Sequence, residues 1–171
     1  QFDEDLHAQN RDLWNYWALT REHAKYFSEE IYQKFKPKNF DKVAEIFQEA
    51  INNREIDEAN LDSEYIDLSG VCAKRELFFM EYLFPEESLF DASKFFDLIY
   101  FKNSCFIHNA SFEESGFFGE TRFDNVQAND AFDLPNAIFH KRADFRNMEV
   151  VGVADMRSVK FKKLPFFKHT T

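Results

Sequence analysis

The stretch HNASFEESGFFGETRFDN at residues 108–125 carries the pattern from which the fold is predicted. Within it a small residue, Ala110 or Thr121, stands two positions before a large one, Phe112 or Phe123. Polar, turn-forming residues follow each large residue. A stacked coil needs this order, because neighbouring coils leave room for only a small side chain at the first of two inward positions.

The same unit recurs along the rest of the chain. It appears again as Ala137-Ile-Phe139, Ala143-Asp-Phe145 and Ala154-Asp-Met156. Large residues are also spaced by five in three groups: Leu61, Ile66 and Val71; Phe96, Phe101 and Phe106; Met156, Phe161 and Phe166. Neither a helix nor a plain strand has this period, so the spacing indicates a coil that turns a corner about every five residues.

The five-residue count is interrupted in three places. Phe106 and Phe112 are six apart, as are Phe139 and Phe145, and each gap predicts a bulged residue. Between Phe123 and Phe139 the count is lost, and we expect Asp133-Leu-Pro135 to form a protruding loop. Residues 74–90 are rich in Leu and Phe but show no clear register.

Composition supports repetition rather than a β-sandwich. The chain has 23 Phe residues but only 4 Gly and 4 Pro, so one bulky side chain serves the same purpose many times. A sandwich would instead show period-two alternation between Gly- and Pro-rich turns.

The segments 107–125 and 136–145 (NAIFHKRADF) resemble pentapeptide-repeat proteins of the Phe-rich A-x-F variety. The resemblance covers roughly residues 59–167. It implies a mainly β solenoid, a right-handed quadrilateral parallel β-helix with four pentapeptides per coil. This length gives about five coils stacked at ~4.8 Å. We assign residues 57–171 to this solenoid.

Residues 1–56 are predicted to form an α-helical N-terminal segment. A helix is expected from about Arg11 to Phe35, ended by Pro37, and a second over 41–51, capped by Asn39. Together they predict a helical hairpin that caps the first coil. Trp14 and Trp17 are interpreted as core residues, with a ligand platform as the less favoured alternative.

Charge is distributed unevenly along the chain. The whole sequence carries −10, made up of −5 over residues 1–58, −10 over 59–139 and +5 over 140–171. No apolar run is long enough to span a membrane. Cys72 and Cys105 suit two buried thiols in a reducing compartment, so we expect a cytoplasmic protein. The chain begins at Gln1 rather than Met, which leaves open that it is part of a longer protein.

The sequence contains no motif of catalytic chemistry. The histidines His7, His23, His108, His140 and His169 lack ligand spacing, and no phosphate-binding glycine motif occurs. The acid pairs Glu86-Glu87 and Glu113-Glu114 are expected at solvent-facing turns. We therefore expect no enzyme activity, no metal and no cofactor.

The candidate functional site is the C-terminal end of the solenoid. Both ends of a solenoid expose unpaired strands and apolar rungs. At this end the candidate residues for self-association or partner binding are Lys160, Phe161, Lys162, Lys163, Phe166 and Phe167. The lysines are also consistent with a simple barrier against further strand addition or with an anion-binding surface.

Sequence alone favours a non-catalytic protein-interaction or scaffold module with a protein partner of unknown identity. A homodimer through the C-terminal coil is one possibility, and no direct nucleic-acid binding is expected. The alternative comes from the resemblance, since some pentapeptide-repeat proteins mimic the acidic surface of duplex DNA and engage a DNA gyrase or topoisomerase. The acidic middle of the chain permits this, but no regular row of acids is visible.

Overall fold

A computed structural model describes residues 3–53 and 65–171. The chain divides into two compact units, residues 1–64 and 65–171, and each is described by itself. The expected boundary after residue 56 and the expected inward residue Leu61 lie outside the described residues. The expected capping of the first coil by the helices stays a prediction.

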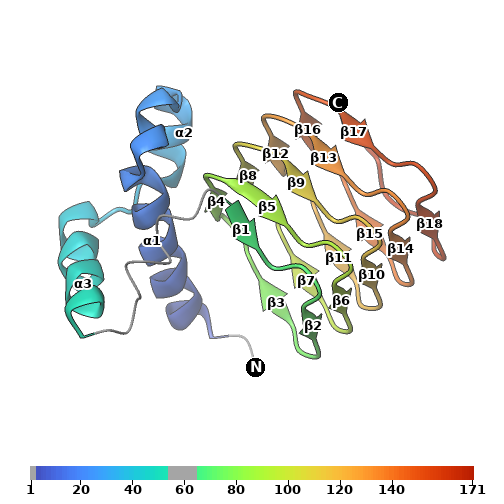
Figure 1. The fold of residues 1–171 in the computed structure, drawn as a ribbon, viewed down its shortest axis with the longest axis horizontal. Helices are drawn as coiled ribbons and strands as arrows, with labels where there is room; N and C mark the ends of the chain where they lie inside the picture. The colour runs from blue at the N-terminus through green and yellow to red at the C-terminus, as the bar shows by residue number, and fades with distance from the viewer. Residues whose placement is uncertain (1–2, 54–64) are drawn as a thin grey trace. The chain divides into compact units, whose positions relative to one another are not determined.

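Within residues 3–53 the N-terminal unit has three α-helices, labelled in Figure 1, and one short 3-10 helix. The single helix expected from Arg11 to Phe35 is wrong, because the chain becomes extended at Arg21 and again at Phe27. The helices are α1 (Glu4–Thr20), η1 (Glu22–Tyr26), α2 (Glu29–Phe35) and α3 (Phe40–Asn52). The second predicted helix is thus confirmed as α3, one residue longer at each end.

Side-chain hydrogen bonds mark the end of α1 and the start of α2. The hydroxyl of Thr20 donates to the carbonyls of Tyr16 and Trp17 at the end of α1. Ser28 then starts a new helix, accepting from the N–H of Ile31. Asn39 stands at the N-cap position of α3, as expected, but its side chain makes no capping bond.

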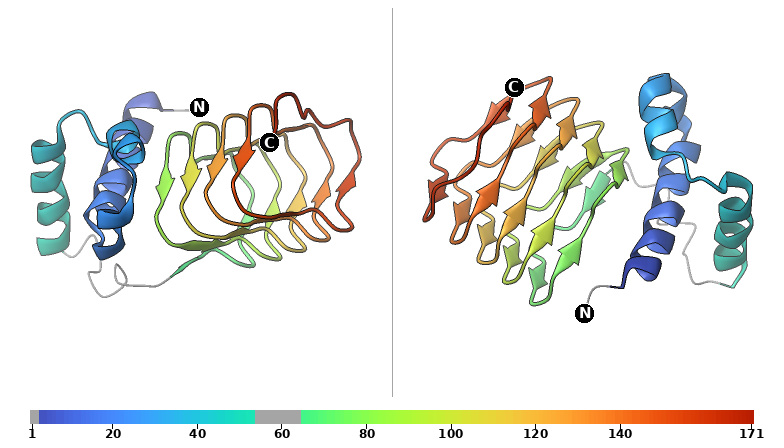
Figure 2. Two further views of the ribbon diagram at one scale, coloured as in Figure 1. Left: turned by 90° about the horizontal axis from the view of Figure 1, so that it is seen from above. Right: turned by 180° about the vertical axis from the view of Figure 1, so that it is seen from behind.

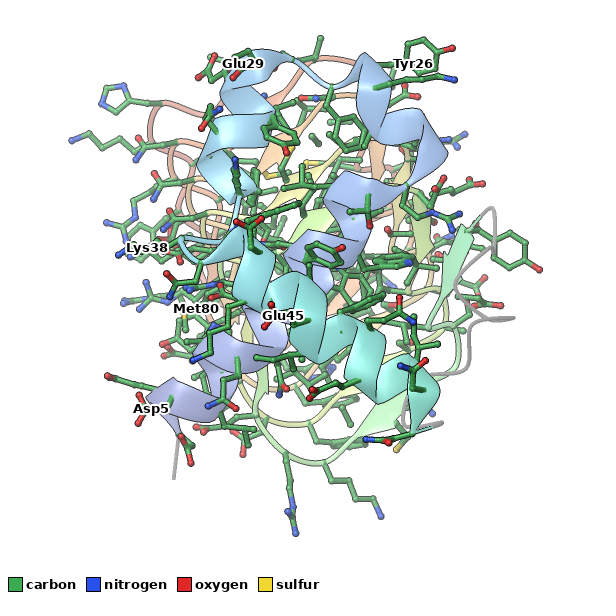
Figure 3. The ribbon with its side chains drawn as sticks, turned by 90° about the vertical axis from the view of Figure 1, so that its left-hand side faces the viewer. Asp5, Tyr26, Glu29, Lys38, Glu45 and Met80 are labelled. Atoms are coloured by element: carbon green, nitrogen blue, oxygen red, sulfur yellow. The ribbon has the colours of Figure 1, made fainter. Side chains whose placement is uncertain are left out.

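Aromatic contacts join α1 to α3. The ring of Tyr16 lies 4.9 Å from that of Phe40 and 5.3 Å from that of Phe47, measured between centroids. Trp14 and Trp17 meet edge to face at 5.0 Å and are half-buried rather than fully enclosed. Charged side chains such as Glu29 and Glu45 lie on the outside of the helices (Figure 3). Of the helices described, none is both long and apolar enough to cross a bilayer.

The second unit is a parallel β-solenoid with four sides, confirming the predicted fold class (Figures 1 and 2). One sheet has the strand order β1-β5-β9-β13-β17, and the second contains β2, β6, β10, β14 and β18. The other two sheets are β3-β7-β11-β15 and β4-β8-β12-β16. The strands are β1 (Tyr65–Asp67), β2 (Cys72–Ala73), β3 (Leu77–Phe78), β4 (Leu83–Phe84), β5 (Glu87–Leu89), β6 (Lys94–Phe95), β7 (Ile99–Tyr100), β8 (Cys105–Phe106), β9 (Ala110–Ser111), β10 (Gly116–Phe117), β11 (Thr121–Arg122), β12 (Gln127–Ala128), β13 (Phe132–Asp133), β14 (Ile138–Phe139), β15 (Ala143–Asp144), β16 (Glu149–Val150), β17 (Ala154–Asp155) and β18 (Lys160–Phe161).

Each coil contains 22 residues rather than the 20 that four pentapeptides would give. Tyr65 pairs with Glu87, and Lys94 pairs with Gly116, in each case a residue 22 positions further along the chain. At this length the solenoid has between four and five coils, because two sheets hold five strands and two hold four. The expected number of about five coils is therefore slightly too high.

The repeat that underlies the coil is eleven residues, or half a coil. A backbone with positive φ recurs at this spacing from Gly70 (φ 69°) through Glu81 (φ 62°) to His169 (φ 56°). At most of these sites the following residue donates to the carbonyl three positions before it, as Val126 does to Phe123. Positive φ at the third residue of such a turn is typical of type II. Asn is common here because it tolerates this backbone region better than most residues.

The spacing between inward residues alternates between six and five because every second corner contains this turn. From Phe95 the inward rings follow at Phe101, Phe106, Phe112 and Phe117, in steps of six, five, six and five. The two six-residue gaps predicted as bulges are therefore regular sides. The strict five-residue period also placed Phe96 and Phe166 inward, which is wrong: both face outward and are 45% and 40% exposed.

The interior is filled by four columns of side chains that stack from coil to coil. Two columns are aromatic through most of their length: Phe79, Phe101, Phe123, Phe145 and Phe167 form one, and Phe95, Phe117, Phe139 and Phe161 the other. The remaining two become aliphatic towards the C-terminus: Phe84, Phe106, Ala128 and Val150; Leu68, Phe90, Phe112, Leu134 and Met156. Cofacial rings in the first column lie between 4.9 and 5.3 Å apart.

A small residue in one column is balanced by a large residue at a neighbouring inward position. Ala128 replaces the Phe that precedes it in its column, and Phe132, four residues later, occupies a position that holds Ala110 one coil before. The ring of Phe132 is buried 5.9 Å from Phe106 and 5.4 Å from Phe112. The loop expected at Asp133-Leu-Pro135 is therefore wrong, since Phe132–Asp133 forms β13 and Leu134 is buried.

Buried serines connect successive coils just after the turns. Each hydroxyl donates to a carbonyl of the preceding coil and accepts from an N–H of that coil. The donor bonds run from Ser93 to Leu68, from Ser104 to Phe79 and from Ser115 to Phe90. Each hydroxyl thus bridges the carbonyl and the N–H at the two ends of a turn in the preceding coil, inside the solenoid.

Outward side chains also stack at the 22-residue spacing. The amide of Asn147 donates to Asn125 at 2.9 Å, and that of Asn125 donates to Asn103 at 3.1 Å. On another side, the buried carboxylate of Asp144 accepts from Arg146 at 2.6 Å and from Arg122 at 3.2 Å. Burial opposes ionisation of Asp144, but these hydrogen bonds and charges hold its pKa below the usual value.

Replacing Asn125 separates the two roles of this turn residue. Asn125→Gly removes both amide hydrogen bonds but accepts positive φ, whereas Asn125→Ala loses the bonds and strains the backbone. We expect Asn125→Ala to lower the free energy of unfolding by about 1–2 kcal/mol more than Asn125→Gly. Urea titrations of both variants measure this difference. Equal losses would contradict the assigned backbone conformation.

Asp144→Asn tests the buried carboxylate. At pH 7 we expect the free energy of unfolding to fall by about 1–3 kcal/mol, because a charged acceptor for two arginines is lost. The folded pKa of Asp144 lies below its unfolded value of about 4, so its contribution is complete above that pH and disappears as pH falls through the folded pKa. The gap between wild type and variant should therefore narrow in urea titrations as the pH is lowered below about 4. Asp155→Asn, which breaks an exposed pair with Arg157, is the matched control and should have a much smaller effect.

Candidate protein-binding surface at the C-terminal end of the solenoid

The last coil ends two of the inward aromatic columns. Phe161, on β18, stacks on Phe139 with centroids 5.0 Å apart, and Phe167 stacks on Phe145 at 4.9 Å. The two end rings meet edge to face at 6.0 Å. No further coil covers them in the described part of the chain, and Phe167 is 47% exposed. The structure thus brings these two predicted site residues together at the open end.

Phe166 is not part of the open end, although the five-residue count placed it there. The backbone of Phe166 forms an isolated parallel β-bridge with that of Asp144 in the neighbouring coil. Its side chain points outward from this side of the solenoid. The guanidinium of Arg142 lies 4.7 Å from the centre of its ring, and that of Arg146 lies 5.6 Å away. These cation–π contacts hold Phe166 against the side wall.

The three predicted lysines surround the open end without forming it. Lys160 and Lys162 flank the inward Phe161 and therefore face outward from the sheet that ends with β18. Lys163 follows at the corner, and all three side chains are exposed. The lysines lie at the rim, and the surface that they border is apolar.

Other exposed apolar residues of the last coil were missed from sequence. Val151 and Val153 are 66% and 68% exposed, and Leu164 is 89% exposed. They belong to the same last coil as Phe161 and Phe167. Counting by eleven rather than by five would have assigned all of them to this coil, because the repeat position of each residue is then fixed.

Two strands at this end have unused hydrogen-bonding edges. β17 and β18 are each the last strand of their sheets, with one neighbour among the described strands. One coil earlier, the N–H groups of Phe132 and Leu134 donate to carbonyls of the last coil. The equivalent groups 22 residues later are the N–H groups of Ala154 and Met156, which point past the last coil. Such an edge can accept another strand.

Charges near the end are arranged in pairs on its sides. Arg157 donates to the carboxylate of Asp155 at 2.6 Å, and this hydrogen bond lowers the pKa of Asp155. Burial raises the pKa of Asp133, which lies one coil before Asp155 in the same column. These acids stand on a side wall, away from the apolar end.

The residues considered for chemistry are dispersed. In residues 3–53 and 65–171, no three His, Cys, Asp or Glu side chains gather closely enough to hold a metal ion. Cys105 is buried, but Cys72 is exposed, which corrects the expectation of two buried thiols, and neither forms a disulfide. Glu113 and Glu114 face solvent, as predicted, whereas Glu86 is buried, which was not expected. What the last coil can offer is therefore an apolar surface with strand edges.

Comparison of the chain with protein-family models, with curated proteins and with solved structures finds no match.

Proposed function

We propose that this chain is a non-catalytic protein-interaction module that associates through the open C-terminal end of its solenoid. The observation that carries the proposal is the set of uncovered rungs at that end. Phe161 and Phe167 end two aromatic columns, and the exposed Val153 and Leu164 lie on the same coil. Surrounding them with another protein would remove apolar surface from water at about 25 cal/mol per Å².

A second copy of the chain is the simplest occupant. Two identical ends related by a two-fold axis present the same apolar centre to each other, and their β17 edges can pair as antiparallel strands. Charge repulsion between the two ends opposes this contact, because residues 140–171 carry a net charge of +5 in each copy. Added salt screens that repulsion, so association through this end should become tighter as salt is raised.

Membership of the pentapeptide-repeat class is part of the same proposal. The small-x-large units support it, since Ala110, Thr121, Ala137 and Ala143 are all buried two positions before a buried Phe. The alternation of five- and six-residue sides departs from a uniform pentapeptide, and we regard the chain as an eleven-residue variant of that architecture.

The acidic DNA-mimic alternative has less support. A mimic of duplex DNA needs acids at regular intervals along one wall. The outward column of Tyr100, Arg122 and Asp144 instead has an aromatic, a basic and an acidic residue in turn. Arg122 lies over the Tyr100 ring and pairs with Asp144. Engagement of a gyrase or topoisomerase therefore remains the second hypothesis.

Ala154→Pro tests association through the β17 edge. Pro removes the N–H that points past the last coil, and Pro165 already occupies the equivalent position eleven residues later, so the backbone should accept it. Light scattering over a range of concentrations should show a dimer for wild type, strengthened between ~0.05 and ~0.5 M salt. The variant should stay a folded monomer.

Ala110→Pro serves as the matched control. It has the same chemistry at the same repeat position, but the N–H of Ala110 donates to Ala131 inside the solenoid, so this variant should lose stability. A wild-type chain that stays monomeric at both salt concentrations would contradict self-association. An Ala154→Pro variant that dimerises like wild type would exclude the β17 edge.

A further inference from the structure

The outer face of the sheet formed by β2, β6, β10, β14 and β18 is strongly basic in an acidic chain. On each strand we consider the two residues that flank the inward side chain and the corner residue that comes next. Four of the five strands have an exposed base at one or more of these positions. These bases are Lys74, Arg75, Lys94, Lys141, Lys160, Lys162 and Lys163, and the one acid among the same described positions is Asp97. None of the seven bases forms an ion pair within residues 3–53 and 65–171. We call this surface the basic face.

An outward aromatic stack occupies the middle of the basic face. The rings of Phe96 and Phe118 are parallel within 9° and 4.8 Å apart, and His140 stacks on Phe118 at 4.4 Å. Gly116 makes room for the stack, because a Cβ there would lie 2.9 Å from Cε2 of Phe118. Phe96 remains 45% exposed. Ile138 stands beside His140 on β14, so the centre of the face is apolar and its two ends are basic.

The aromatic stack favours carboxylates over nucleobases. Single-stranded nucleic acids are held by stacking each base on a free aromatic face. Here both faces of Phe118, and one face each of Phe96 and His140, are used by stacking within the protein. The ring edges, which carry the positive part of the aromatic quadrupole, are left for a ligand. Edges of this kind next to unpaired lysines suit carboxylate oxygens, and the apolar centre suits aliphatic or aromatic side chains.

The spacing of the charges defines the ligand further. Successive rungs are about 4.8 Å apart, so Lys74 on the β2 side and Lys162 after β18 are separated by four rungs, or about 19 Å. An extended peptide advances about 3.3 Å per residue, so about six residues cover this distance. A segment of that length with acids at both ends and apolar residues between would match both basic ends and the apolar centre.

We propose that the basic face binds an acidic segment of a partner protein, an extended peptide with carboxylates at both ends and apolar side chains between them. The peptide lies along the stack of coils, with its apolar residues on Phe96, Phe118 and Ile138. This site is lateral and does not depend on the self-association proposed for the open end.

Fluorescence anisotropy with a labelled peptide of sequence DELFLED tests the proposal directly. We expect saturable binding that weakens as salt is added, and a Kd at least about tenfold higher for the neutral counterpart NQLFLQN. Combining Lys94→Gln with Lys160→Gln should raise the Kd about tenfold, and Phe96→Ser should raise it several-fold. All three positions face outward, so circular dichroism should show unchanged folding.

Two controls separate this site from other effects. Lys102→Gln removes a base from another side of the solenoid, one that lies 3.9 Å from Asp124, and should leave the Kd within about twofold. Ala154→Pro should alter self-association but not peptide binding. Equal binding of both peptides, or no binding of either, would overturn the proposal. So would an oligothymidylate of equal charge that binds more tightly and depends on Phe96, because the face would then be a nucleic-acid site.

Discussion

Every inward side chain of this solenoid must stack on the residue 22 positions further along the chain. Phe101 on Phe123 and Phe117 on Phe139 show the contact in its simplest form, with nearly parallel rings. Each such pair contributes about 0.5–1.5 kcal/mol beyond the burial of its area. Four columns run side by side, so one extra residue in a coil would misplace all of them. A turn whose third residue has positive φ recurs every eleven residues and keeps the coil length constant.

This constraint acts on inward positions and leaves the outward ones free to carry function. The outer surface differs accordingly from place to place: one corner has an amide ladder through Asn125, one side wall has Asp144 with its arginines, and another is the basic face. The open end follows from the same columns, because Phe161 and Phe167 complete a pattern that has no next coil among the described residues. The end and the basic face are thus two separate surfaces of one framework, and binding at each is a proposal.

The fold class could be predicted from sequence because the small-x-large units mark inward positions by size alone. Register could not be predicted by counting in fives, because several inward Phe residues have a second Phe beside them, as in Phe95-Phe96 and Phe166-Phe167. Either member of such a pair fits a size pattern, and only the position of the turn decides between them. For the candidate site, the structure places Phe161 and Phe167 at the open end and Phe166 on the side wall, and their role in binding stays a prediction. Val153 was missed because counting in fives did not fix its repeat position.

Backbone nuclear Overhauser effects measured by NMR test the central claim most directly. In a solenoid with 22-residue coils, amide and α protons of residue i should show contacts to residues near i + 22 on all four sides. The contacts should continue through both six-residue gaps, at 106–112 and 139–145, without a shift in register. Contacts centred on i + 20, or a register that changes at those gaps, would contradict the eleven-residue repeat and the stacked columns that depend on it.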